Sequence, residues 1–325
     1  MALPLPSFFD PSEVKDLRIE RAALVAEAAR EHKRAHGIRP AAEDRPRIAA
    51  FGIDCQIGFS LPGASLFVPG AVEDMQRAIT WLYRNLDRIT SLHLSLDTHR
   101  AFQVFHPGFW RDVDGNPPAP LTPIFHEEVR ARRWTPTRAD LYDACVEYTR
   151  KLEEGGRYVL TIWPYHTLLG GVSHALVPSL MEAALFHALA REAPTLFTSK
   201  GMAEMTEMYS VLSPEVTEVA GEQVGAFDGE LFDALMSHDR VYVFGEAKSH
   251  CVLSTLKDLM ARIEAKDTTL AEKVYVLEDA MSPVPAPPLD PLPPGLDFPR
   301  LADEGLRELA NKGMRIVRTT DDLEL

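Results

Sequence analysis

The segment Val241-Tyr-Val-Phe-Gly-Glu-Ala-Lys-Ser-His-Cys-Val252 decides the fold of this chain. Its first four residues, 241–244, are apolar, which is typical of a parallel β-strand buried on both faces. Gly245 allows a tight turn after the strand, and Cys251 then lies near the start of a predicted helix. Unpaired N–H groups at such a position lower the pKa of a thiol and can stabilise an oxyanion. The segment therefore predicts a reactive cysteine, and a small buried core residue is the alternative interpretation.

The composition narrows the class of protein. The chain has 325 residues, 46% of them hydrophobic, which is normal for a globular protein with a sizeable core. Its net charge of −14 argues against nucleic acid and anionic membrane surfaces as partners. No apolar run approaches membrane-spanning length, and the first residues do not read as a secretory signal. The three cysteines are widely spaced and imply no disulfide framework, so we expect a cytoplasmic protein.

Strand and helix patterns alternate along the chain. This alternation predicts an α/β fold with a doubly wound, mostly parallel six-stranded sheet covered by helices on both faces. The predicted strands are 47–54, 90–97, 195–199, 241–244, 273–277 and 314–317, with a short extended segment at 157–163. The predicted helices are 71–85, 139–153, 179–190, 227–236, 249–265 and 301–312.

Three segments lie outside this regular pattern. Residues 1–46 are predicted to form an N-terminal extension with one helix at 14–36, to which Leu17 and Ile19 would contribute apolar contacts. This helix could pack on the main domain, 47–325, or on a partner subunit, and we expect a homo-oligomer. A long irregular insertion at about 111–158 and a proline-rich surface loop at 283–299 interrupt the main domain.

Three reactive groups follow predicted strands directly. Asp54, Lys200 and Cys251 would meet at one edge of the sheet, because parallel strands place their carboxyl ends together. The lysine could stabilise a thiolate, and the aspartate could take the thiol proton and return it to a leaving amine. Separately, the three residues could be a helix cap, a solvated lysine and a core cysteine, but their shared location favours a catalytic triad.

A second group has the character of a metal site. Asp97 and His99 are separated by one residue on an extended segment, so both side chains point the same way. His166 from a distant loop could complete the site, and His106 competes for that place. A carboxylate with two imidazoles suits zinc, and iron or manganese equally well.

Aromatic and amide side chains surround the same strand ends. Phe59, Phe109 and Trp163 could form a wall for a planar ligand, although such residues are more often ordinary core. Gln56 and Phe59 follow Asp54, where open α/β sheets place ligand-binding groups.

Five motifs occur in the order seen in the isochorismatase-like cysteine hydrolases, and the chain most resembles their nicotinamidase branch. The resemblance spans roughly residues 47–320. The motifs are Asp54-x-Gln56-x-x-Phe59, Asp97-x-His99, Trp163-Pro-x-His166, Lys200-Gly201 with Tyr209-Ser210, and Gly245-x-Ala247-x-x-x-Cys251-Val252.

The resemblance implies a role for each residue of the triad. Cys251 would be the nucleophile, Asp54 the general base and acid, and Lys200 the partner that stabilises the thiolate. The N–H groups of Ala247 and Cys251 would form the oxyanion hole, after a cis peptide bond between Glu246 and Ala247.

The resemblance also implies a metal ion and a substrate. Asp97, His99 and His166 match the metal ligands of nicotinamidases, whose ion binds the pyridine nitrogen of the substrate, so a divalent ion such as zinc is expected. Gln56, Phe59 and Trp163 would contact a small-molecule amide.

The expected activity is therefore hydrolysis of a small amide through a thioester with release of ammonia, with nicotinamide to nicotinate as the best candidate. The alternatives are hydrolysis of another small amide, such as a carbamoyl or ureido compound, an isochorismatase-type hydrolysis, or a non-catalytic binding or scaffold role. Departures from the family pattern concern the substrate more than the chemistry. Ser249 replaces an acidic residue, Thr167 replaces a cysteine, and the insertion lies between the metal motifs.

Overall fold

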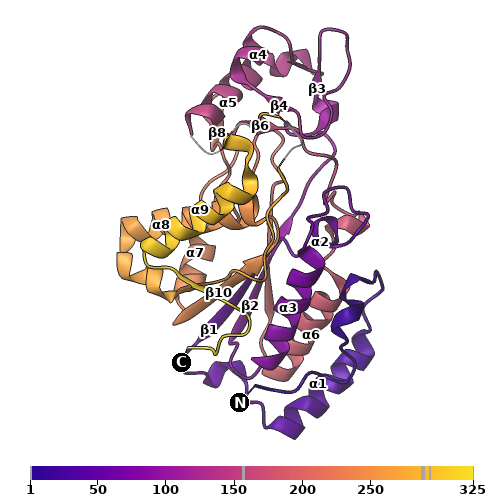
Figure 1. The fold of residues 1–325 in the computed structure, drawn as a ribbon, viewed down its shortest axis with the longest axis vertical. Coiled ribbons are helices and arrows are strands. Elements are labelled where there is room, and N and C mark those ends of the chain that lie inside the picture. The colour runs from indigo at the N-terminus through magenta and orange to yellow at the C-terminus, as the bar shows by residue number, and fades with distance from the viewer. Residues whose placement is uncertain (1, 156–157, 287–289, 293, 325) are drawn as a thin grey trace.

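A computed structural model describes residues 2–155, 158–286, 290–292 and 294–324 of the chain. Its centre is a parallel six-stranded sheet in the order β12-β11-β10-β1-β2-β7 (Figure 1). The strands are β1 (Ile48–Ile53), β2 (Ser91–Asp97), β7 (Thr195–Lys200), β10 (Arg240–Gly245), β11 (Val274–Leu277) and β12 (Arg315–Val317). The predicted α/β fold with six parallel strands is thereby confirmed.

Strand β10 shows why the sheet must be covered on both sides. Val241 and Val243 belong to one hydrophobic cluster, whereas Tyr242 and Phe244 belong to the other. Successive side chains of a strand point to opposite faces, so a continuous apolar run needs a helical layer on each face.

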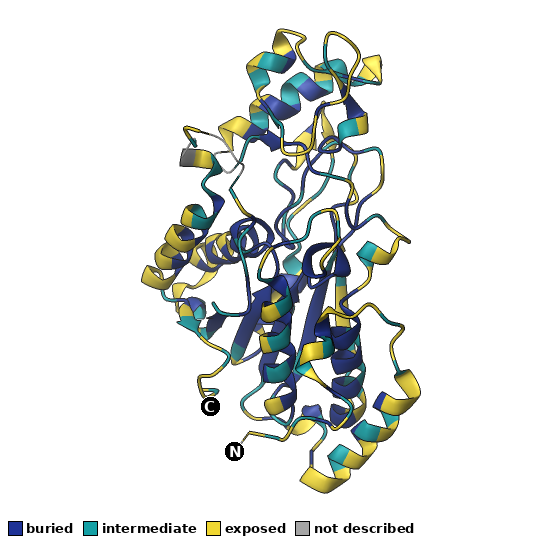
Figure 2. Cartoon of the chain, turned by 45° about the vertical axis from the view of Figure 1, so that its right-hand side comes forward, coloured by how far each residue is buried: buried dark blue, intermediate teal, exposed yellow. Residues whose placement is uncertain are grey.

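Six helices supply these layers, and Figure 2 shows the dark blue, buried sheet strands between them. Those on one face are α1 (Ala22–His36), α3 (Ala71–Arg84) and α6 (Pro178–Arg191). Those on the other face are α7 (Gly229–Met236), α8 (Leu253–Lys266) and α9 (Phe298–Asn311). Among the residues described, every helix is too short or too polar to cross a lipid bilayer.

The N-terminal extension differs from its prediction. A 3₁₀ turn at Pro11–Lys15 and helix α1 replace the single predicted helix, and extended backbone separates the two. Arg18 and Arg21 in this break both bind the buried carboxylate of Glu182 in α6, each with an N–O distance of 2.9 Å. Leu17 and Ile19 are 63% and 86% exposed, so they provide no apolar contact. The ion pairs, which local sequence does not reveal, favour extended backbone here, and α1 packs on α6 of the same chain.

The insertion contains more regular structure than the sequence indicates. It lies beyond the carboxyl ends of the sheet strands, at the top of Figure 1, and its buried residues extend one of the two main clusters. Its elements are β3 (Trp110–Arg111), β4 (Pro123–Ile124), α4 (His126–Arg130), β5 (Thr135–Pro136) and α5 (Tyr142–Glu154). The remaining short elements are α2 (Ile57–Ser60), β6 (Leu160–Thr161), β8 (Glu218–Val219) and β9 (Glu222–Gln223).

The proline-rich segment is not only a surface loop. Val284 near its beginning is only 5% exposed and packs in a main hydrophobic cluster. Helix α9 begins at Phe298, one residue before the predicted end of the loop. Residues 287–289 and 293 of this segment lie outside the described residues.

Replacement of Gly245 by Ala should destabilise the fold strongly. Gly245 has a φ of +135°, and an added Cβ would overlap the backbone of Ile53. We expect a loss of about 4 kcal/mol or more in the free energy of unfolding, measured by urea denaturation. Gly37→Ala is the matched control, because Gly37 has a φ of +61° with no atom within 4 Å, and it should lose about 1 kcal/mol. Equal losses in the two variants would contradict the steric account.

Candidate active site

Four neighbouring strands end at one site. Strands β10, β1, β2 and β7 are adjacent in that order, and their carboxyl ends lie at one edge of the sheet. Asp97 and Lys200 are the last residues of β2 and β7 and are register partners. Asp54 follows β1, and Cys251 lies in the turn after β10. The predicted triad and the predicted metal ligands therefore occupy the same place.

A small, nearly closed cavity lies at this edge. Its free volume is about 20 Å³, which holds about one water molecule. Its lining comprises Phe59, Leu66, Asp97, His99, Trp163, His166, Lys200, Glu207, Tyr209, Ala247, His250, Cys251 and Val284. A ligand larger than water can therefore enter only if lining side chains move.

Lys200 is the centre of the charged cluster. Its Nζ lies 2.7 Å from Asp97 Oδ1, 3.0 Å from Asp54 Oδ2 and 3.7 Å from Cys251 Sγ. It also donates to the carbonyl oxygen of Met208 at 3.0 Å. Burial by itself disfavours the ammonium ion, but the charges of Asp54 and Asp97 outweigh it and raise the pKa of Lys200 well above its usual value. Lys200 is therefore a permanent buried cation.

The proton of Cys251 has one good acceptor. Burial raises the pKa of the Cys251 thiol well above its usual range, although Lys200 acts in the opposite direction. The sequence-based expectation of a lowered thiol pKa is therefore wrong for the closed cavity, because two carboxylates already compensate the single ammonium ion. Burial also raises the pKa of Asp54, which hydrogen-bonds to the thiol. A thiolate can thus form by transfer of its proton to Asp54.

The turn before Cys251 presents a backbone N–H group. Ala247 has a φ of +57°, and its N–H donates to no group among the described residues. The N–H groups on either side both donate hydrogen bonds. The Glu246 N–H donates to Ile53 O at 2.9 Å, and the Lys248 N–H donates to Ser282 O at 2.8 Å. The Glu246–Ala247 bond is trans, since the cis bonds in the described chain are Arg45–Pro46 and Asp290–Pro291. The expected cis bond is therefore wrong: the left-handed conformation of Ala247 and the positive φ of Gly245 make the turn.

Asp97, His99 and His166 form a group that could hold a metal ion, with all ligand atoms within 4.8 Å of one another. His99 Nδ1 bonds to the carbonyl of Gly201 at 3.0 Å, and His166 Nδ1 to that of Pro164 at 2.7 Å. Each Nε2 faces Asp97 Oδ2, at 2.7 and 3.4 Å. One carboxylate and two imidazole nitrogens that converge in this way form a donor set that fits a divalent metal ion.

His106 lies beside this group but not within it. Its ring centroid is 5.7 Å from that of His99 and 6.0 Å from that of His166. Both of its ring nitrogens are buried without a hydrogen-bond partner in the described structure, and burial lowers its pKa to about 3. His106 is therefore a neutral imidazole next to the metal ligands.

The residues predicted to contact the substrate separate into two groups. Phe59 and Trp163 line the cavity, and the Trp163 indole donates to Tyr209 Oη at 3.0 Å. Gln56 does not line it, because its side-chain amide binds the backbone of Asp97 and His174. Gln56 thus supports Asp97 in this structure, and its predicted contact with the substrate stays a prediction. Phe109 is a core residue away from the cavity lining.

The structure adds residues that the sequence did not single out. The Tyr158 ring at the end of the insertion stacks on His250 with a centroid distance of 4.7 Å, and its hydroxyl donates to the carbonyl of Ser249. The Ser249 hydroxyl pairs with His250 Nδ1 at 2.9 Å and accepts the N–H of Val284 at 3.1 Å. These four residues form what we call the roof of the cavity. Glu207 also lines the cavity, and burial raises its pKa to about 7.

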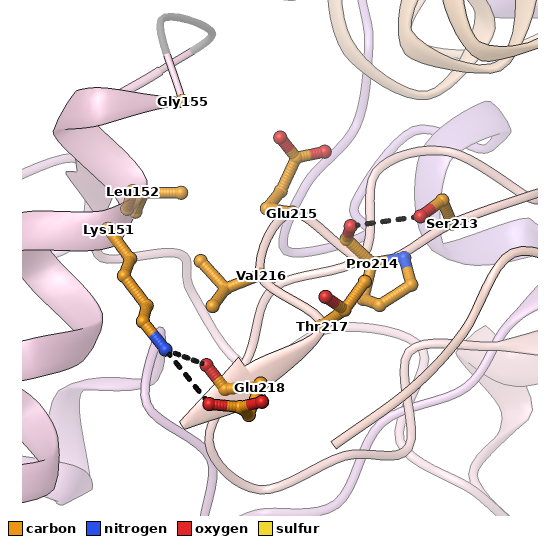
Figure 3. Close-up of a pocket in the computed structure, with 9 residues that line it drawn as sticks. All are labelled: Lys151, Leu152, Gly155, Ser213, Pro214, Glu215, Val216, Thr217 and Glu218. Carbon is orange, nitrogen blue, oxygen red and sulfur yellow. Dashed lines mark hydrogen bonds and ion pairs between the residues drawn. The ribbon is translucent and has the colours of Figure 1, made fainter. Parts of the chain in front are cut away.

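A larger cleft elsewhere lacks this chemistry. It has a volume of about 460 Å³ and lies between the end of α5 and residues 213–218 (Figure 3). Lys151 in this cleft pairs with the carboxylate of Glu218 at 3.6 Å and with its carbonyl at 2.8 Å. The cleft contains a surface ion pair but neither the nucleophile nor the metal ligands, so the closed cavity is the candidate active site.

Comparison with known proteins identifies the fold. No protein-family model matches the chain, and no curated protein sequence matches it. The solved structure of a nicotinamidase/pyrazinamidase from Acinetobacter baumannii is 18% identical with a TM-score of 0.53, covering 86% of this chain and 100% of that one. The yeast nicotinamidase bound to the inhibitor nicotinaldehyde is 17% identical with a TM-score of 0.52, covering 83% and 99%. The chain therefore has the predicted isochorismatase-like hydrolase fold, which these nicotinamidases share.

The donor set predicts binding of one divalent metal ion. Wild-type protein should bind zinc in calorimetric titration, and His99→Ala and His166→Ala should each weaken binding by at least about 100-fold. His174→Ala is the control, because its Nε2 bonds to the Thr98 hydroxyl outside the group. His106→Ala, titrated in parallel, measures any contribution from that neighbour. Zinc affinity that is unchanged in His99→Ala and His166→Ala would exclude this site.

Proposed function

We propose that this protein is a cysteine amidohydrolase that cleaves a small amide through a thioester intermediate and releases ammonia. The observation that carries the proposal is the contact of Lys200 with Asp54, Asp97 and Cys251 beside a metal-ligand group in one cavity. Structural neighbours that are named as nicotinamidases support the same reaction class.

The first half of the reaction forms the thioester. Asp54 accepts the proton of Cys251, and Lys200 stabilises the resulting thiolate, which attacks the amide carbonyl carbon. The N–H groups of Ala247 and Cys251 donate to the developing oxyanion. Asp54 then returns the proton to the amide nitrogen, the C–N bond breaks and ammonia leaves.

The second half releases the acid. Asp54 takes a proton from a water molecule, and the resulting hydroxide attacks the thioester carbonyl within the same oxyanion hole. The C–S bond breaks, the carboxylic acid leaves, and the proton held by Asp54 returns to the sulfur of Cys251. When bound by Asp97, His99 and His166, a divalent ion would orient the substrate through a ligand atom such as a ring nitrogen.

Nicotinamide is the substrate that we propose first. The aromatic rings of Phe59 and Trp163 suit a flat heteroaromatic amide, which the small cavity admits once lining side chains move. The yeast neighbour was solved with nicotinaldehyde, an inhibitor. Another small amide is the second candidate, because His250 and Glu207 add polar groups to the cavity lining.

Ammonia release from a panel of amides headed by nicotinamide tests the reaction and the substrate together. Cys251→Ala should lower kcat by at least about ten-thousand-fold, because it removes the nucleophile. Asp54→Asn should lower kcat by about a hundred- to ten-thousand-fold, because it removes the proton acceptor. Cys55→Ala and Cys145→Ala are the controls, as both thiols are buried away from the cavity lining.

The outcomes of this panel separate the alternatives. Release only from carbamoyl or ureido compounds would keep the triad but exclude nicotinamide as the substrate. Hydrolysis of a vinyl ether without ammonia release would favour isochorismatase-type activity. No turnover, together with slow alkylation of Cys251, would favour the scaffold role.

Replacement of Tyr158 should change substrate selection. Tyr158→Ala removes the ring that packs behind His250, so the ratio of kcat/KM for a ring-substituted nicotinamide to that for nicotinamide should rise by about tenfold or more. Tyr158→Phe removes the hydroxyl that donates to the Ser249 carbonyl but keeps the ring, and should change kcat/KM by about two- to tenfold. Tyr142→Ala alters the insertion where the Tyr142 hydroxyl bonds to Val129 O, away from the cavity, and serves as the control. An unchanged ratio in Tyr158→Ala would show that the roof does not select substrate size.

A further inference from the structure

Glu246 is a buried acid that the proposed reaction does not use. It lies between Gly245 and Ala247, in the turn that presents the Ala247 N–H, and it is 0% exposed. Neither of its carboxyl oxygens has a hydrogen-bond partner in the described part of the chain. An ionised carboxylate buried without a partner would cost several kcal/mol of folding free energy, so the groups around Glu246 determine its charge.

Arg77, the cation that faces Glu246 among the described residues, already has partners. The titratable groups that face it are Asp74 and Arg77 of α3 and Cys55 in the turn after β1. Arg77 already pairs with Asp74 Oδ1 at 2.6 Å and donates to the carbonyl of Asp279. Asp74 repels a second negative charge. Burial raises the pKa of Glu246 well above its usual value, with the charge of Asp74 adding to the effect.

Glu246 also precedes a backbone N–H group that no hydrogen bond holds in place in the described structure. The N–H of Glu246 is held by Ile53 O, and that of Lys248 by Ser282 O. The Ala247 N–H between them has no such partner in the described structure. The direction of this N–H is set by rotation about the Cα–C bond of Glu246, whose side chain is fully buried.

We propose that Glu246 is a positioning residue of the oxyanion hole, which directs the Ala247 N–H toward the cavity while its own buried carboxyl group is protonated. Loss of this proton places an uncompensated charge beside Asp74, moves the side chain and turns the Ala247 N–H away. The catalytic part of this proposal rests on the proposed amidase function.

Thermal unfolding tests the protonation of Glu246 without any substrate. Because the pKa is raised in the folded state, the folded protein retains the proton to a higher pH than the unfolded chain. The contribution of Glu246 to the free energy of unfolding is therefore fully present at low pH. It falls as pH rises from the ordinary pKa of a glutamate to the pKa of Glu246 in the folded protein. Glu246→Gln cannot ionise, so its Tm relative to wild type should rise across this range. A Tm difference that is independent of pH would overturn the proposal.

The position of the Ala247 N–H can be followed directly. In protein labelled with ¹⁵N-alanine, the Ala247 amide resonance, assigned by its loss in Ala247→Gly, should shift with pH in wild type and stay constant in Glu246→Gln. The exposed Glu73→Gln on α3 makes the same charge change and should titrate like wild type. An Ala247 resonance that shifts equally in Glu246→Gln would overturn the proposal even if the protein has no amidase activity.

The kinetic counterpart is the pH profile of ammonia release. Wild-type kcat should fall by about tenfold per pH unit above the titration seen for Ala247, and this fall should move to higher pH in Glu246→Gln. For Glu246→Gln the readout is the pH at which this fall occurs, and not kcat at neutral pH. The same alkaline fall in wild type and Glu246→Gln would exclude the positioning role. Absence of ammonia release in wild type would instead refute the amidase function and leave the resonance measurement to decide the role of Glu246.

Discussion

One buried ammonium ion holds the site together. Lys200 contacts the carboxylates of Asp54 and Asp97 and the sulfur of Cys251, and thus joins the ends of β1, β2 and β10 to its own strand, β7. Two buried carboxylates in contact with a single cation leave no compensation for a third negative charge. This constraint determines the proton chemistry, since a thiolate can form only if one carboxylate takes up the proton.

The sequence predicts the parts of the structure that arise from local patterns. Strands β1, β10 and β11 could be predicted because buried parallel strands are continuous apolar runs, and the order of the chain then brings Asp54, Lys200 and Cys251 to one edge. Long-range interactions determine what could not be predicted. The break before α1 depends on Glu182, far along the chain, and Glu246 is buried near Asp74 and Arg77, which local sequence does not reveal.

Two irregular segments contact the residues next to the candidate nucleophile. The insertion provides Tyr158 and the proline-rich segment provides Val284, and both contact the pair Ser249 and His250 directly before Cys251. Glu246, in the same turn, is buried near Asp74 and Arg77. The reactive groups thus lie at the edge of the sheet, whereas the roof contacts come from the insertion and the proline-rich segment.

Acylation of Cys251 is the step that defines the proposed reaction. Acid quenching of the protein during turnover of its amide substrate, followed by peptide mass spectrometry, measures this step directly. We expect a mass increase of one acyl group on the peptide that contains Cys251. Ammonia release without any acyl-peptide, or with the acyl group on Cys55 or Cys145, would contradict it.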